Sequence, residues 1–111
     1  GAAVSIAEPH RVLLRVGAVL VEDETRCALV FNDVLVLAVP RKSWLQQKLY
    51  MVTAIHPLRQ GSVHSGSDGA LMLSLESGNV LAIRTNSEQE AWHAALASAV
   101  GYSNSAVNRG R

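Results

Sequence analysis

The feature that most constrains the fold is a short amphipathic helix expected near the C-terminal end, after a series of strands. Glu90 follows Ser87 by three residues, a spacing typical of a capping box that starts a helix. Gly101 stands where a left-handed C-terminal cap is expected. Apolar side chains at helical spacing predict one buried face: Trp92, Ala95, Leu96, Ala99 and Val100. The chain before residue 86 must therefore form an apolar surface that this helix covers.

Composition limits the class of protein. The chain has 111 residues, of which 49% are hydrophobic and 17% charged, as expected for one globular domain. Cys27 is the single cysteine, so no internal disulfide can form, and we expect it to act as a small buried hydrophobe. The net charge is only +1 and no basic cluster is present, so a nucleic-acid partner is not expected.

The rest of the chain reads as short strands joined by polar turns. The connections are too short for parallel crossovers, so the strands are expected to pair antiparallel. Six or seven strands would form a barrel, and the helix would plug one of its open ends. The expected strands cover residues 11–21, 26–31, 34–39, 48–56, 70–75 and 80–85, with a further short strand near 62–65. Gly17 is interpreted as a bend or bulge in the first strand.

The expected domain covers residues 11–101, between a tag or linker remnant at 1–10 and a flexible polar tail at 102–111. The opening residues lack a methionine, which suggests a domain cut from a longer protein. No apolar run reaches the roughly 18 to 20 residues that span a bilayer. The expected location is the cytoplasm, with peripheral membrane or cytoskeletal association left open.

Three segments in order resemble a pleckstrin homology (PH) domain, most closely those that follow the catalytic module of Dbl-type exchange factors. They are LRVGAVL at 14–20, LVFNDVLVLA at 29–38 and LAIRTNSEQEAW at 81–92. The resemblance implies a mainly β fold, a seven-stranded antiparallel barrel or sandwich capped by one C-terminal amphipathic helix. It assigns Trp92 and Leu96 to the plug. It also implies a non-catalytic module that targets or scaffolds a larger signalling protein.

Some members of that family bind phosphoinositide headgroups through basic residues on the first two strands and nearby loops. The positions that match here are Arg15, Arg26, Arg41 and Lys42. The first loop, residues 22–25, carries three acidic side chains where the lipid-binding pattern has bases, and these would repel a phosphate. Weak headgroup binding at a membrane is therefore the alternative function rather than the main one.

A protein partner, or a neighbouring domain of the same chain, is the main expectation. The early strands are apolar on both faces, and a barrel hides only one face. Trp44 lies beside bases in the loop after residue 40, where it could anchor a protein contact, enter a membrane interface or fold back onto the barrel. The oligomeric state is left open. A phosphotyrosine-binding or EVH1-type relative, with a peptide groove between helix and sheet edge, is a structural rival.

No catalytic, cofactor or metal site is expected. The four histidines lack metal-ligand spacing and have no cysteine pair beside them. The loop 61–69 contains serine, histidine and aspartate, but a catalytic triad needs rigid, separated supports rather than one loop.

Overall fold

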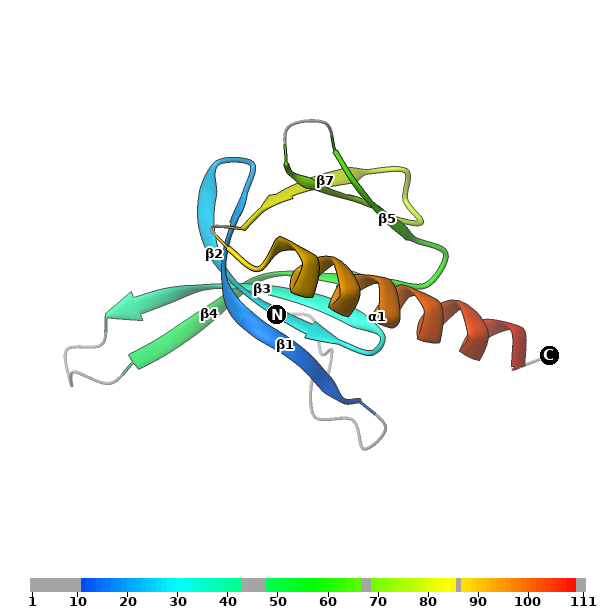
Figure 1. Cartoon of the computed structure of the whole chain (residues 1–111). Coiled ribbons are helices and arrows are strands. Elements are labelled where there is room, and N and C mark those ends of the chain that lie inside the picture. Colours follow the sequence, from blue (N-terminus) through cyan, green and yellow to red (C-terminus); the bar gives the residue numbers. More distant parts are fainter. Residues whose placement is uncertain (1–10, 43–47, 67–68, 86, 110–111) are drawn as a thin grey trace.

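The structure is a computed structural model that describes residues 11–42, 48–66, 69–85 and 87–109 (Figure 1). It contains seven strands and one helix in this part of the chain. The strands are β1 (Leu13–Val21), β2 (Glu24–Phe31), β3 (Val34–Lys42), β4 (Lys48–Pro57), β5 (Ser62–Ser65), β6 (Leu71–Ser74) and β7 (Val80–Arg84). The helix is α1 (Gln89–Arg109).

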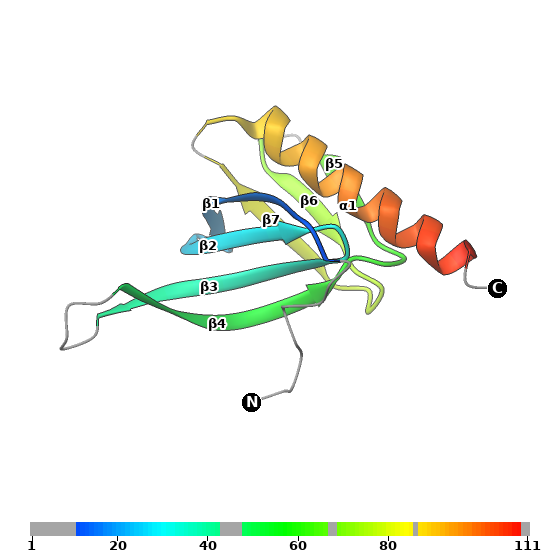
Figure 2. The ribbon, with the colours of Figure 1, turned by 90° about the horizontal axis from the view of Figure 1, so that it is seen from below.

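All recorded strand pairs are antiparallel, and the strands form one sheet in the order β4-β3-β2-β1-β7-β6-β5. The predicted fold class is confirmed: the protein is mainly β, with seven antiparallel strands and one C-terminal helix. The short strand expected near residues 62–65 is also confirmed as β5. The sheet bends so that β1–β4 and β5–β7 form two halves, with α1 lying across them (Figures 1 and 2).

The core lies between the sheet and one face of α1. Alternation along the strands sends every second side chain inward. On β2, Ala28 and Val30 are buried in the core cluster, while Cys27 and Leu29, which alternate with them, are only partly buried. The largest fully buried side chains come from both halves of the sheet and from the helix: Leu35, Leu58, Leu71, Leu73, Ile83 and Leu96.

Val34, Val36 and Ala38 of β3 are buried although they lie outside the core cluster. Val36 pairs with Leu29 on one side and Ile55 on the other, so an apolar row crosses the outer face of the sheet. The expectation that these strands are apolar on both faces therefore describes their side chains correctly.

Trp92 connects the helix to β1. Its exposed fraction is only 4%. A Cβ at Gly17 would lie 3.1 Å from Cζ2 of the indole, so the absence of a side chain there makes room for the ring. The irregularity in β1 lies between Leu13 and Arg15, and the prediction of a bulge at Gly17 is wrong. Close approach of Trp92 explains this glycine instead.

Both predicted helix boundaries need correction. The Trp92 amide donates to the carbonyl of Glu88 over 3.1 Å, and Glu88 has φ 62°, so Glu88 rather than Ser87 is the N-cap residue. With Glu88 at the N-cap, the N3 position is Ala91, so the predicted capping box of Ser87 and Glu90 does not form. The carboxylate of Glu88 pairs with Arg15 on β1. The two residues are 73 positions apart, so local spacing does not reveal this interaction.

Gly101 does not end the helix, which continues to Arg109. Two hydrogen bonds attach the part of α1 after Gly101 to the rest of the fold, one at the β2–β3 turn and one in the loop after β4. Ser103 Oγ donates to the Asn32 carbonyl over 3.1 Å, and the Gln60 amide donates to Asn104 Oδ1 over 2.6 Å. The residues expected to start a flexible tail, 102–109, are therefore described as helix.

Candidate functional site

Arg15, the first residue of the expected headgroup site, is bound to the helix. Its guanidinium pairs with the carboxylate of Glu88, and its Cζ lies 4.9 Å from the centroid of the Trp92 ring. Such a cation–π contact is favourable because the ring face carries negative potential. The Arg15 side chain is only 25% exposed. Arg15 therefore fixes the start of α1 on β1, and the carboxylate of Glu88 already balances its charge.

Arg26 is also paired within the chain. It contacts the carboxylate of Glu24 and donates to the carbonyl of Thr25 over 2.8 Å. Glu22 and Asp23 at the β1–β2 turn both have positive φ, as the tight two-residue hairpin requires. The acidic loop predicted at residues 22–25 is observed as a two-residue turn at Glu22 and Asp23. Glu24 already belongs to β2, and its carboxylate pairs with Arg26.

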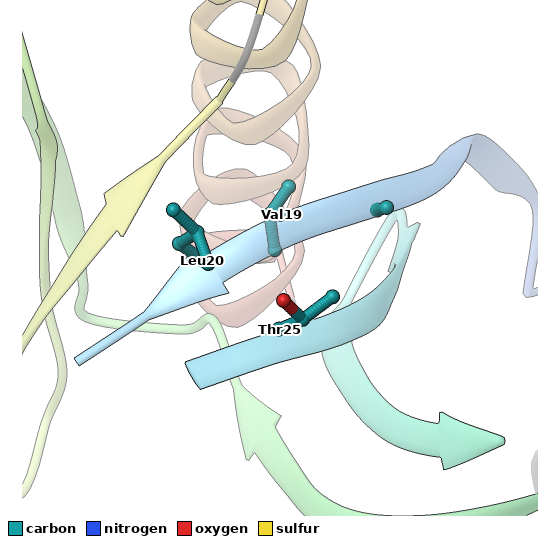
Figure 3. Close-up of a pocket in the computed structure, with 4 residues that line it drawn as sticks. Val19, Leu20 and Thr25 are labelled. Carbon is teal, nitrogen blue, oxygen red and sulfur yellow. The ribbon is translucent and has the colours of Figure 1, made fainter. Parts of the chain in front are cut away.

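A shallow pocket of about 240 Å³ lies beside this turn. It is lined by Ala18, Val19, Leu20 and Thr25 of β1 and β2, and three of these are labelled in Figure 3. The lining offers aliphatic groups and one hydroxyl, which is a poor match for a multiply charged phosphate. The pocket therefore does not complete a headgroup site.

The other two expected headgroup residues lie on a different element. Arg41 is near the end of β3, is exposed, and its Nη1 lies 3.6 Å from Sδ of Met51. Lys42 ends β3 and pairs with Lys48, but its side chain lies outside the described atoms. Trp44 lies outside the described residues. Among the described side chains, Arg15 pairs with Glu88 and Arg26 with Glu24, whereas Arg41 contacts Met51.

Arg41 belongs to a projecting two-stranded segment. The recorded pairing of β2 with β3 ends at Cys27 and Ala38, whereas β3 and β4 pair onward to Lys42 and Lys48. Residues 39–42 and 48–51 are called the β3–β4 arm here, and Figure 2 shows it extending past the neighbouring strands. An isolated two-stranded hairpin has little stability in water, so the arm is a segment that a partner would stabilise.

The side chains of the arm and its base are unusually apolar for an exposed segment. Leu49 is 50% exposed, Tyr50 57%, Met51 43% and Val52 43%. Large exposed apolar patches mark contact surfaces on soluble proteins. The sequence reading missed this run because it placed these residues in an ordinary strand, whereas their exposure depends on where β2 stops pairing.

The stretch of sequence that contains the arm carries charges of one sign. No acidic residue occurs in the sequence between Asp33 and Asp68, whereas Arg41, Lys42, Lys48 and Arg59 all fall there. Asp33 itself forms a two-point ion pair with Arg11, with both distances 2.8 Å. The arm is therefore a basic and apolar element in a chain whose net charge is close to zero. This segregation was readable from the sequence.

A second pocket, of about 310 Å³, lies at the opposite end of β4 and is lined by His56, Pro57, Leu75, Glu76 and Ser77. Burial lowers the pKa of His56 from its ordinary value of 6.5. Glu76 faces Arg59, with 3.4 Å between Nε and Oε2. Within the described residues no hydrogen bond joins His56 to Glu76 or Ser77, so the three groups do not form a relay of the kind a serine hydrolase needs.

Among the described residues, no group of three or more histidine, cysteine, aspartate or glutamate side chains is arranged to hold a metal ion. No helix in the described part is long and apolar enough to cross a membrane.

The described residues contain two exposed apolar runs, one at residues 49–52 and one at residues 12–14 and 16 at the start of β1. The arm is the candidate surface because it also projects past the neighbouring strands and carries the exposed base Arg41, whereas Arg15 and Arg26 are paired within the chain. The sequence matches none of the protein-family models it was scanned against, and a search of curated proteins finds no match either.

Proposed function

We propose that this chain is a non-catalytic, PH-like interaction module of a larger signalling protein, and that its main role is contact with a protein or a neighbouring domain. The observation that carries the proposal is the exposed run Leu49–Val52 on the β3–β4 arm and at its base. Burying apolar surface gives about 25 cal/mol per Å², so a partner that covers this run gains affinity from it.

The state of the arginines supports protein contact over headgroup recognition. Arg15 and Arg26 are each paired with a carboxylate of the same chain. A phosphate would have to displace these carboxylates and would lie close to the acidic turn, where like charges repel. Location in the cytoplasm, at a membrane surface or on the cytoskeleton belongs to the same proposal.

Site-specific photo-crosslinking tests the proposal. A photoreactive phenylalanine analogue replaces Tyr50 on the arm or, as a matched control, Tyr102 on the helix, which is 45% exposed. In cells that produce the full chain, we expect discrete protein adducts from position 50 that Arg41→Glu removes. Position 102 should give none of these adducts. No protein adduct from position 50, together with tight binding to lipid vesicles, would reject the proposal.

Phosphoinositide-dependent membrane targeting is the second candidate, and the basic charge of the arm favours it. Arg41 is exposed and Lys42 and Lys48 stand beside it in the sequence. Vesicles containing phosphatidylinositol bisphosphate are compared with vesicles in which phosphatidylserine supplies the same charge. A specific site predicts preference for the first kind and loss of that preference in Arg15→Ala, Arg26→Ala or Arg41→Ala. Equal binding to both kinds would indicate screened surface attraction alone.

A further inference from the structure

The inference concerns the free edge of β4, and it rests on the proposed function. Among the described strands, β4 is the last in the sheet order and pairs with β3 on one side only. Figure 2 shows β4 as the outermost strand on its side of the molecule. Its first residues, Lys48–Thr53, run over about 20 Å at the rise of an extended strand. Unpaired main-chain groups along such an edge can bind another extended chain.

The ladder indicates which peptide groups of β4 face outward. Pro40 pairs with Tyr50 and has no N–H to donate, so the pair fits a non-hydrogen-bonded position of the antiparallel ladder. At such a position the N–H and C=O of Tyr50 point away from β3, toward the free edge. The next residue, Met51, pairs with Val39 and directs its groups toward β3.

Lysines, prolines and β-bulges commonly interrupt exposed edges. The exposed run at Leu49, Tyr50, Met51 and Val52 contains neither lysine nor proline. This run lies between Lys48, which begins β4, and the register shift of the β3–β4 ladder between Ala38 and Leu37. Side chains alternate across the strand, so an added strand would contact Tyr50 and Val52 on one face and Leu49 and Met51 on the other. Both faces of the added strand would therefore meet apolar groups.

The positive charge of the arm indicates which kind of chain would bind along β4. Arg41, Lys42 and Lys48 belong to the arm, and no carboxylate occurs in the sequence between Asp33 and Asp68. A second copy of this chain paired along β4 would place two basic arms side by side, which like-charge repulsion opposes. A segment that carries carboxylates would instead gain from the same charges.

The unpaired backbone groups of the β4 edge favour a peptide over a lipid bilayer as the occupant. Hydrocarbon offers no hydrogen-bond partner to the outward N–H and C=O groups, and each group left unpaired there costs several kcal/mol. An extended peptide supplies these partners directly. We infer that the β4 edge binds an extended acidic segment of a partner protein as an eighth strand, with its carboxylates near Arg41, Lys42 and Lys48.

The test uses a phage-displayed library of random twelve-residue peptides, panned against the whole chain. We expect the enriched peptides to alternate apolar residues and to be rich in aspartate and glutamate. Arg41→Glu should weaken binding of the synthesised peptides at least tenfold. Tyr50→Pro removes an outward N–H and should weaken it at least as much, whereas Tyr50→Ala keeps that N–H and should retain more of the binding.

Each outcome decides the inference. Amide shifts of ¹⁵N-labelled protein confined to Leu49–Thr53 on addition of the peptide support it, provided that Tyr50→Pro keeps the native spectrum elsewhere. Should Tyr50→Pro prove unfolded, Val52→Pro, the next residue with an outward N–H by alternation, replaces it. Peptides that bind Tyr50→Pro and wild type equally would overturn edge pairing but leave a protein-contact surface. Failure to enrich any peptide, or a dimer in sedimentation equilibrium that buries β4, would overturn the inference while the crosslinking result still decides the proposed function.

Discussion

The end of the sheet that α1 covers and the β3–β4 arm carry the same kinds of side chain but have opposite surroundings. Trp92 is 4% exposed against Gly17 of β1, whereas Tyr50 on the arm is 57% exposed. At the covered end, the ion pair of Arg15 with Glu88 fixes the approach of the helix. The comparison shows that the chain itself covers the apolar side chains under α1, whereas those of the arm remain exposed.

The largest expected effect is at the covered end. Trp92→Ala removes the largest apolar side chain from the core cluster and should lower the free energy of unfolding by about 3–5 kcal/mol. That is a large part of the 5–15 kcal/mol typical of a domain. Urea unfolding followed by circular dichroism measures it. A loss below about 1 kcal/mol would mean that the indole does not hold the helix on the sheet.

Gly17 tests the same contact from the strand. Gly17→Val places a branched side chain where even a Cβ would lie 3.1 Å from the indole, so unfolding should become easier by about 1–3 kcal/mol. Ala18→Val is the matched control, because Ala18 is exposed on the opposite face of β1. Equal effects of the two substitutions in the same unfolding experiment would show that strand propensity, and not the Trp92 contact, explains the glycine.

Gly101 distinguishes the observed helix from the shorter one that the sequence suggests. Nothing lies within 4 Å of a Cβ built at Gly101, which is inside α1, so Gly101→Ala should stabilise the protein by about 1 kcal/mol. A left-handed cap would give the opposite sign, because alanine is strained there. Thermal unfolding of the two proteins decides, with a rise in Tm expected.

The difference between predictable and unpredictable features follows from sequence distance. The alternation of Leu71 and Leu73 is local, and both are fully buried as their spacing predicts. The helix extension depends on the contact of Ser103 with Asn32, which lies 71 positions away. The Arg15–Glu88 pair is equally remote in sequence, so a residue type expected to bind phosphate turned out to bind a carboxylate.

The arm was unpredictable for a related reason. Its strands were recognised from local pattern, but exposure of Leu49 and Tyr50 depends on β2 pairing no further than Cys27. Nothing in the sequence near residue 49 specifies that end point. The absence of acidic residues between Asp33 and Asp68, by contrast, is a local property and was available before the fold was known.

His56, at the other end of β4, gives a smaller effect that depends on pH. Its pKa is lowered by burial, so the folded protein favours the neutral ring over the charged one. The contribution of the neutral His56 ring to the free energy of unfolding is fully present above about pH 6.5. It is lost as the pH falls toward the lowered pKa of the folded state. The Tm of His56→Gln should therefore fall less than that of wild type when the pH is lowered from about 7.5 to 5. Parallel curves for the two proteins would contradict this assignment.

The smallest expected effect on stability is on the arm itself, and it completes the comparison with Trp92. Tyr50→Ala also replaces an aromatic ring by a methyl group, but the ring is already mostly in water. The free energy of unfolding should therefore change by about 0.5 kcal/mol or less, within the range of ordinary surface substitutions. Urea unfolding under the conditions used for Trp92→Ala measures it. A loss of several kcal/mol would mean that the arm belongs to the folding core, and the case for a partner at this end would lose its main support.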